Sequence, residues 1–331
     1  MTTSLNPDEV FQEIAFAAEE LFCIRFSNAT LLDLGWMNLK WKVESSDGDF
    51  VIKQYSQERY RRFGFDKVMA EFHIALQEQM RQHHHGLPCP RLLTHEGNII
   101  QTSPGGERFV IMEYMAGSNL APGSLNCEQM YSLGRVTARM HNLANDGFLG
   151  KYASPKFVPT PMRERLLHWR NLLESADVDN HWSMMIETQL IATEEFSLEE
   201  ISSREPGWAH RDLWVDNLLF EGNDLTAILD FDRFGYDYPE LDVARAIISG
   251  VLRGDGLRME AVTAFVEGYR EHRPLDGSSV VRSMRMLWYM ESPWWIVPTL
   301  NSNRYQEVRF AEEMMWLAKN RNQLGDILGH L

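Results

Sequence analysis

The stretch from Trp208 to Phe231 restricts what this chain can fold into and do more than any other part of it. It contains the triplet His-Arg-Asp, which ends at Asp212, and an Asn five residues later, Asn217. An apolar run then ends in Asp230, followed by Phe231. A lone His-x-Asp triplet carries little information, because Asp and Asn are common in turns. Two acids and an amide at these intervals, joined by apolar segments, indicate a polar site.

The segments between those polar residues have the pattern of a β-hairpin. Residues 218–220 and 226–229 are short apolar runs, with the polar turn Glu-Gly-Asn-Asp between them. Such a hairpin is expected to hold the three polar side chains side by side. Mg²⁺ takes few oxygen ligands from a protein and accepts the rest from substrate phosphates. We therefore predict a Mg²⁺–triphosphate site, in which Asp212 accepts the proton of an attacking hydroxyl and Asn217 and Asp230 bind the metal.

This stretch resembles the catalytic loop and metal-binding segment of the kinase-like phosphotransferases. It is most similar to the aminoglycoside phosphotransferase family, which includes homoserine and choline kinases. The resemblance covers nearly the whole chain in element order, and its specific motifs lie at Lys53, Glu71, 110–115 and 210–232. It implies an enzyme that transfers the γ-phosphate of ATP, with Mg²⁺, to the hydroxyl of a small acceptor of the amino alcohol or aminoglycoside class. A cytoplasmic location is the default expectation.

The first third of the chain predicts a small antiparallel sheet with helices. Apolar residues recur at helical spacing after Asn6-Pro7, which is a good helix start. The order strand–strand–helix–strand–strand that follows matches the small lobe of a kinase-like fold. The expected elements are a helix from Asn6 to Phe22, strands at 39–43 and 50–55, a helix at 66–80, and strands at 98–101 and 109–113.

The remainder of the chain predicts mostly helices. Asn126 can cap the first of them. We expect an α+β, bilobal protein-kinase-like fold, with a nucleotide-binding lobe at 1–116 and a catalytic and substrate-binding lobe at 117–331. The expected helices of the second lobe are 126–143, 161–174, 182–201, 241–251, 257–272, 280–296 and 304–327.

The strand that contains Lys53 resembles the family's nucleotide-lobe strand, which implies that Lys53 reaches the α- and β-phosphates. A charge on an inner strand needs a partner, and Glu71 on the following helix is the candidate. Asp66 competes with Glu71 for this role. Lys40 and Lys42 on the preceding strand are expected to be solvated, as lysines on an edge strand usually are.

Two further nucleotide contacts follow from the resemblance. The chain has no GxGxxG loop, and Gly35 is the only glycine of the segment that would cover the phosphates. The segment 110–115 resembles the family's hinge, where the backbone after a strand pairs with adenine. The expected adenine partners are the carbonyl of Glu113 and the amide of Met115.

Candidate substrate contacts lie among acids and aromatics. Asp216 and Asp232 belong to an acidic stretch that needs compensating cations, either Mg²⁺ or a substrate ammonium. Aromatic residues crowd the segment 288–295, where they form either core or a cage for a cationic substrate. Pro293 is expected to break or kink the helix there and to expose Trp294 or Trp295. Glu291 and Trp294 are the candidates for contact with a substrate amine.

The residues around the triplet have supporting roles. His210 is expected to hold the loop by packing and hydrogen bonding. Asp242 resembles a family aspartate that supports the catalytic loop from below. Arg211 replaces the family's usual glycine and is more typical of protein kinases.

The bulk composition excludes some partners. The net charge of −15 argues against a broad nucleic-acid or anionic-membrane surface and tolerates a cationic substrate. Three widely spaced cysteines indicate free thiols, and the acidic N-terminus does not have the basic start of a signal peptide. The most apolar late segment, 287–300, is too short to span a membrane and contains an acid.

Two alternatives remain beside the small-molecule kinase. The first is a Ser/Thr protein kinase of the stress-response type, which Arg211 favours. Against it, Tyr238-Pro239-Glu240 follows Asp230-Phe231 too soon to frame an activation segment of about two dozen residues. The second is a non-catalytic nucleotide-binding protein, which the presence of all the chemical positions disfavours.

Overall fold

The computed structural model describes residues 6–32, 37–152, 154–175, 179–202, 205–254, 256–298 and 305–331. The chain divides into two compact units. The first is Met1–Gly117 together with Thr226–Phe234, and the second is Ser118–Leu225 together with Gly235–Leu331. The short segment that ends the predicted hairpin, including Asp230, therefore groups with the first unit, beyond the predicted lobe boundary at residue 116.

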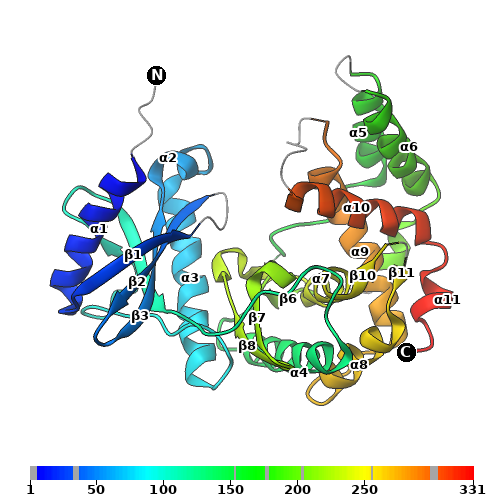
Figure 1. Cartoon of the computed structure of the whole chain (residues 1–331). Helices are drawn as coiled ribbons and strands as arrows, with labels where there is room; N and C mark the ends of the chain where they lie inside the picture. The colour runs from blue at the N-terminus through cyan, green and yellow to red at the C-terminus, as the bar shows by residue number, and fades with distance from the viewer. Residues whose placement is uncertain are drawn as a thin grey trace. The chain divides into compact units, whose positions relative to one another are not determined.

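A five-stranded antiparallel sheet forms the centre of the first unit (Figure 1). Its strand order is β1-β2-β3-β5-β4. The predicted hairpin is present, because β2 pairs with β3 from Asn38↔Tyr55 to Ser45↔Gly48. The strands are β1 (Phe26–Leu32), β2 (Asn38–Ser45), β3 (Gly48–Tyr55), β4 (Gln101–Thr102) and β5 (Arg108–Glu113).

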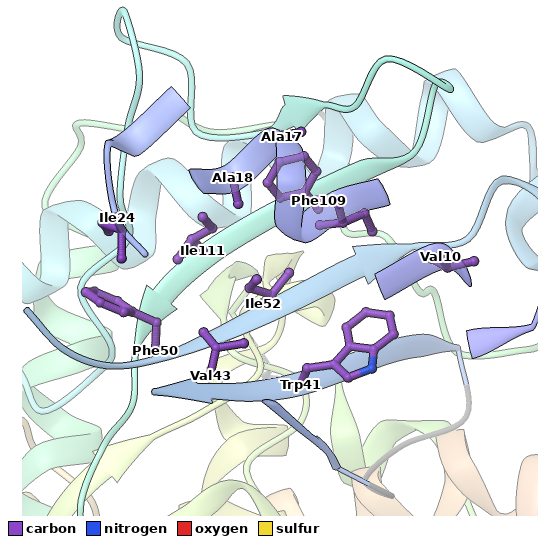
Figure 2. Packing of buried hydrophobic residues seen from close by; sticks show 11 residues of the cluster. Val10, Ala17, Ala18, Ile24, Trp41, Val43, Phe50, Ile52, Phe109 and Ile111 are labelled. Carbon is purple, nitrogen blue, oxygen red and sulfur yellow. The ribbon is translucent and has the colours of Figure 1, made fainter. Parts of the chain in front are cut away.

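Helices α1 (Pro7–Phe22) and α3 (Phe65–His84) cover opposite faces of this sheet. The Asn6 side chain accepts a hydrogen bond from the Asp8 N–H and so caps α1 as predicted. Figure 2 shows α1 above Trp41, Ile52 and their neighbours, which point to one face. Because successive strand residues point to opposite faces, the alternate residues, among them Lys53, point toward the α3 side. The short helices α2 (Gln57–Tyr60) and η1 (Arg61–Phe63) join β3 to α3.

Two strands of the sheet differ from expectation. β1 was not predicted, and five of its seven residues are exposed, so its sequence shows little apolar alternation. The predicted strand at 98–101 is reduced to β4. The first residue of the predicted strand lies in a tight turn instead, because Asn98 exchanges two backbone hydrogen bonds with His95.

The second unit is largely helical, as predicted. Asn126 and Gln129 form a full capping box at the start of its first helix. That helix packs closely along α8 (Met259–Arg270), because a Cβ at Gly134 would lie 2.1 Å from the Phe265 carbonyl oxygen. The helices are α4 (Cys127–Ala144), α5 (Met162–Leu173), α6 (Asn180–Glu194), α7 (Pro239–Val251), α8 (Met259–Arg270), α9 (Gly277–Trp295), α10 (Tyr305–Asn320) and α11 (Leu324–Leu328).

Two predicted helices are each divided in the structure. The helix expected at 182–201 ends at Glu194, and Ser197 then caps the separate 3-10 helix η2 (Leu198–Ile201). The helix expected at 304–327 is divided into α10 and α11. Pro293 does not break α9, which continues to Trp295.

Short strands frame the segment that contains the His-Arg-Asp triplet. β6 (Gly207–Ala209) pairs with β9 (Gly235–Asp237). The loop then passes through the 3-10 turn η3 (Val215–Asn217) into the predicted hairpin, β7 (Leu218–Glu221) and β8 (Asp224–Ile228). The pair β10 (Leu252–Arg253) and β11 (Gly256–Leu257) lies before α8, and η4 (Phe231–Arg233) follows β8. Among the described residues, no helix has the length and apolarity needed to cross a membrane.

Candidate active site

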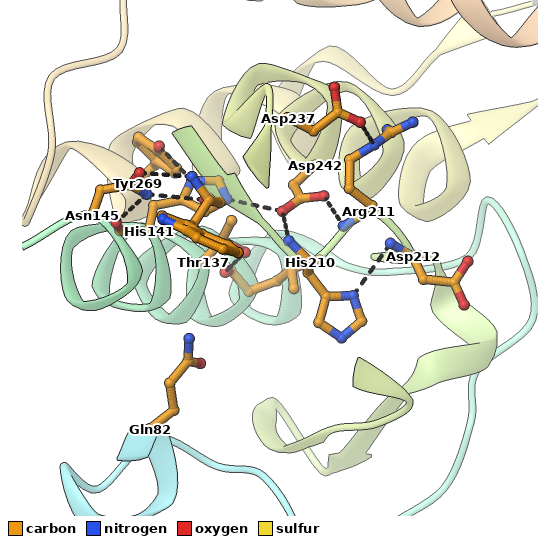
Figure 3. Close-up of polar contacts among 12 residues, drawn as sticks. Gln82, Thr137, His141, Asn145, His210, Arg211, Asp212, Asp237, Asp242 and Tyr269 are labelled. Carbon is orange, nitrogen blue, oxygen red and sulfur yellow. Dashed lines mark hydrogen bonds and ion pairs between the residues drawn. The ribbon is translucent and has the colours of Figure 1, made fainter. Parts of the chain in front are cut away.

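The backbone of the His-Arg-Asp loop is held by Asp242 of α7. This fully buried carboxylate accepts hydrogen bonds from the N–H groups of His210 and Arg211, each at 2.7 Å (Figure 3). His141 of α4 contacts the same carboxylate at 3.0 Å. Burial alone would raise the pKa of Asp242, but the contact with His141 and the neighbouring His210 and Arg211 outweigh it and lower that pKa. Asp242 therefore supports the loop as an ionised acceptor, as the resemblance implied.

Arg211 has a left-handed backbone, with φ at 65°. A side chain raises the energy of this conformation by about 1 kcal/mol or more, which explains why glycine suits the position. The buried guanidinium lies 2.6 Å from Asp237 Oδ2 and 3.3 Å from Glu291 Oε1. The two hydrogen bonds to Asp242 and these ion pairs offset the backbone strain.

Asp212 and Asn217 form a hydrogen-bonded pair in this loop. The Asn217 amide donates to the backbone oxygen and to the Oδ2 of Asp212, both at 2.8 Å. The Asp212 N–H also donates to His210 Nδ1 at 3.3 Å, so His210 holds the loop as expected. The pair fixes the orientation of the Asp212 carboxylate and uses the nitrogen of the Asn217 amide, which leaves its oxygen as a potential metal ligand.

Buried arginines bind two of the predicted substrate residues. Glu291 is 6% exposed and contacts both Arg211 and Arg245. Arg309 of α10 holds Asp216 through two contacts of 3.2 Å. Arg245 and Arg309 in turn share Glu313, at 2.6 and 3.6 Å. This chain of ion pairs extends from Asp237 to Asp216 and supports the loop on both sides of Asp212, so the two acids have structural partners in addition to any substrate role.

The aromatic residues at the end of α9 separate into two groups. Trp295 is buried, whereas Trp294 is 37% exposed and lies edge-on to Phe157 at 5.3 Å. Trp288 and Tyr289 are buried and pack on Phe196. Most of this group is therefore core, and Trp294 remains the accessible candidate for a substrate contact.

In the first unit, Lys53 of β3 contacts two carboxylates. Its Nζ lies 2.8 Å from Asp230 Oδ1 and 2.7 Å from Asp232 Oδ2, and its side chain is 4% exposed. Burial would lower the pKa of Lys53, but Asp230 and Asp232 outweigh burial and raise it well above the usual value. Burial likewise opposes ionisation of Asp230, yet Lys40 and Lys53 hold the pKa of Asp230 well below its usual value. Lys53 and Asp230 are therefore both charged.

The expected partner of Lys53 was Glu71. The structure gives Lys53 two aspartate partners. Glu71 lies half-buried on α3, and its ion pair with Lys53 stays a prediction. Asp232 also accepts a hydrogen bond from Asn38 at 2.8 Å and lies 3.3 Å from the Tyr55 hydroxyl. Burial raises the pKa of Asp232 despite the opposing effect of Lys53. The contact of Asp232 with a substrate stays a prediction.

Lys40 differs from the expectation that it is solvated. Its Nζ lies 2.8 Å from Asp230 Oδ2, and its side chain is only 18% exposed. Lys42 on the same strand pairs with Asp49 at 2.8 Å and is more exposed, at 27%. The prediction that Lys40 is solvated is wrong because β2 lies inside the sheet and Lys40 points to the same face as Lys53, where the Asp230 carboxylate pairs with it.

The predicted hinge, 110–115, overlaps the end of β5. Glu113 ends β5, where its N–H donates to the Arg91 carbonyl and its carboxylate lies 2.7 Å from Arg91 Nε. Met115 follows two residues later in the same unit. The adenine contacts of both remain predictions, and Gly35 lies outside the described residues.

The oxygen ligands predicted for a metal fit Mg²⁺ by their chemistry. Asp230 is ionised, and Asn217 has an amide oxygen whose geometry is fixed by the hydrogen bonds of its nitrogen to Asp212. Carboxylate and amide oxygens are ligands that Mg²⁺ accepts. Asp212 and Asn217 are brought together in the second unit, whereas their predicted grouping with Asp230 of the first unit stays a prediction.

Several residues of the site were missed from the sequence. Arg309 and Arg245 each occur in helical segments without a recognisable motif, so nothing in the sequence signals their partners. Lys40 could have been found from the hairpin, because a two-residue turn at Ser46-Asp47 sets Lys40 opposite Lys53.

Comparison with known proteins identifies relatives along most of the chain. The model of the phosphotransferase enzyme family matches residues 28–276. The homoserine kinase of Methylobacillus glycogenes is 26% identical over 274 residues, which cover 80% of this chain and 79% of the relative. A homoserine kinase of Rhizobium etli is 27% identical over 283 residues, which cover 82% and 81%.

Solved structures share the fold. A microcompartment-associated aminopropanol kinase superposes with a TM-score of 0.63 at 19% identity, over 95% of this chain and 99% of that one. A spectinomycin phosphotransferase, solved in complex with ADP and spectinomycin, gives 0.61 at 13% identity, over 94% and 98%. These matches confirm the predicted kinase-like α+β fold. The family model spans well over half of the sequence, and the chain therefore belongs to the phosphotransferase enzyme family.

Proposed function

We propose that this protein is a small-molecule kinase that uses ATP and Mg²⁺ to phosphorylate the hydroxyl of an amino alcohol. Hydroxy amino acids such as homoserine are included, because the curated relatives named above are homoserine kinases. The aminopropanol kinase supports the same acceptor class, and the spectinomycin enzyme supports an aminoglycoside as the next candidate. The net charge of −15 is compatible with an acceptor that carries an ammonium group.

The Asp212–Asn217 pair is the observation that carries this proposal. Asp212 is half-buried in a loop whose backbone is fixed by Asp242, and its carboxylate is oriented by the Asn217 amide. In phosphoryl transfer the protein contributes mainly positioning and charge stabilisation. We assign to Asp212 the acceptance of the proton from the acceptor hydroxyl, whose oxygen forms the new bond to the γ-phosphorus as the bond to ADP breaks.

The nucleotide contacts are assigned mainly to the first unit. Lys53 neutralises phosphate charge, with Glu71 as a further partner, and Gly35 is assigned a role in covering the phosphates. The Glu113 carbonyl and the Met115 amide pair with adenine. Asn217 and Asp230 hold Mg²⁺, which when bound neutralises charge on the transferred phosphoryl group. Support for these roles comes from the family, from the ionised state of Lys53 and Asp230, and from the hydrogen bond that orients the Asn217 amide.

A protein acceptor is less well supported than a small molecule. The residues between Phe231 and Pro239 form η4 and β9, and α7 begins directly afterwards. This leaves no room there for the longer activation segment that protein kinases use to dock a peptide. Arg211, which favoured a protein kinase, is buried and paired with Asp237 and Glu291. Its side chain is therefore accounted for by the structure of the loop.

The test is ATP consumption with Mg²⁺ against a panel of acceptors. The panel contains homoserine, 1-amino-2-propanol, choline, spectinomycin, a hexose and an unstructured protein. Wild type is compared with Asp212→Asn and with Asp224→Asn, a control at an exposed acid of the same hairpin. Turnover of an amino alcohol that is lost only in Asp212→Asn supports the proposal. Phosphate transferred only to protein, or no binding of ATP, would overturn it.

A further inference from the structure

The two lysines Lys40 and Lys53 lie directly opposite each other in the first unit. The β2–β3 register pairs them, and cross-strand partners point to the same face of a sheet. Their strand neighbours Trp41 and Ile52 point to the other face, into the core beneath α1. Like charges at directly opposite positions are destabilising unless an anion lies between them. The position of Lys40 opposite Lys53 therefore requires an anion that offsets the repulsion between the two charges.

The anion in this structure is Asp230. Its Oδ2 contacts Lys40 Nζ and its Oδ1 contacts Lys53 Nζ, both at 2.8 Å. Each carboxylate oxygen thus has its own lysine, and Asp232 supplies a further contact to Lys53 alone. The charges of the two lysines and the two aspartates balance within this group. Lys40 and Lys53 therefore bind the two oxygens of one carboxylate.

Burial distinguishes Lys40 from the other lysine of its strand. The side chains of Lys40 and Asp230 are 18% and 22% exposed, whereas those of Lys42 and Asp49 are 27% and 38% exposed. A partly dehydrated ammonium interacts more strongly with an anion than one in water. The side chain of Lys40 is also more accessible than that of Lys53, which is 4% exposed. This combination suits a residue that binds phosphate rather than one that only stabilises the sheet.

We propose that Lys40 is a second phosphate-binding lysine, which acts together with Lys53 on the phosphate chain of the nucleotide. This inference rests on the proposed function, since it concerns the nucleotide site of a kinase. Lys53 is the lysine that family resemblance identifies, and Lys40 is added by the strand register and by the shared carboxylate. Two positive charges on one face would neutralise more of the triphosphate than Lys53 alone. Lys40 would then contribute to nucleotide affinity and to the position of the phosphates.

The test is to measure binding of Mg²⁺-ATP and of adenosine by titration calorimetry. Adenosine has the base and sugar but no phosphate, so the ratio of the two affinities reports phosphate contacts and is insensitive to a partial loss of folded protein. The variants are Lys40→Met, Lys40→Arg, and Lys42→Met as the matched control on the same strand. A charge-assisted contact corresponds to a change in affinity of about tenfold to one-hundredfold.

We expect Lys40→Met to weaken ATP binding by about tenfold or more and to change adenosine binding by less than about twofold. Lys40→Arg, which keeps the charge, should retain most of the ATP affinity, and Lys42→Met should leave the ratio of affinities unchanged. Unchanged ATP affinity in Lys40→Met, or an equal loss of both ligands, would overturn the role of Lys40 while the proposed function stands. Wild-type protein that binds neither ligand would overturn both.

Discussion

Asp242 accepts a hydrogen bond at 2.7 Å from the backbone N–H of Arg211, a residue held at a φ of 65°. The other carboxylate oxygen accepts from His210 N–H and contacts His141. One buried aspartate thus stabilises a strained turn directly before Asp212. The position of the candidate catalytic carboxylate depends on a residue that need not touch any substrate.

We predict that Asp242→Asn destabilises the protein by about 2–4 kcal/mol, because an amide nitrogen replaces one acceptor and leaves a buried N–H without a partner. Turnover should fall by at least about tenfold, since the loop that carries Asp212 loses its support. Urea unfolding and kcat measure the two effects. Asp224→Asn at an exposed position is the control, and a variant as stable and active as wild type would contradict this role for Asp242.

The two acids of the proposed site should respond differently to substitution. Asp212→Asn is expected to lower kcat by about 10²- to 10⁴-fold and to leave ATP affinity nearly unchanged, because only the proton acceptor is lost. Asp230→Ala should instead weaken binding of Mg²⁺-ATP itself, because it removes a metal ligand and the carboxylate that pairs with Lys40 and Lys53. Steady-state kinetics and calorimetry separate the two. Wild-type turnover in Asp212→Asn would show that the assignment of the proton acceptor is wrong.

Elements with a clear local signal could be predicted from the sequence. Helix α1 begins where Asn6 and Pro7 indicate, and the β2–β3 hairpin follows the alternation of Trp41 and Val43 with lysines. The Asp212–Asn217 pair could be predicted because both residues lie in one short loop. Strand β1 could not, because its exposed residues carry no apolar pattern.

Long-range ion pairs could not be predicted for a physical reason. Lys40 and Asp230 are separated by 190 residues, and Asp216 and Arg309 by 93. No local preference selects such partners, because they depend on how whole strands and helices pack. For the same reason the contacts of Lys53 with Asp230 and Asp232 could not be predicted, whereas the ion pair of Lys53 with Glu71 stays a prediction.

The buried position of Glu291 leads to a test of its two possible roles. Glu291→Gln should destabilise the protein by about 3–5 kcal/mol, because the charges of Arg211 and Arg245 lose a shared buried partner. If the main role of Glu291 is to bind a substrate amine, the substitution should instead raise KM for the acceptor and change the stability of the protein little. Thermal unfolding and acceptor KM, compared with the exposed control Glu312→Gln, distinguish these roles.

Asp237 gives the protein a specific pH dependence. Burial raises the pKa of its carboxyl to about 6. The contact with Arg211 opposes this rise, whereas the negative charges of Asp242 and Glu291 add to it. The folded protein therefore binds this proton more tightly than the unfolded chain, whose Asp has a pKa of about 4. The contribution of Asp237 to stability is then most favourable below about pH 4 and declines as the pH rises to about 6.

We predict that Asp237→Asn removes this decline, which amounts to at most about 3 kcal/mol for a shift of about two pKa units. Urea unfolding of both proteins between pH 4 and 7 measures it as the difference between the two stability profiles. Stability of wild type relative to Asp237→Asn should decrease with rising pH and become constant above about pH 6.5. A difference that increases with pH would show that the ion pair with Arg211 outweighs burial and that the pKa of Asp237 is lowered.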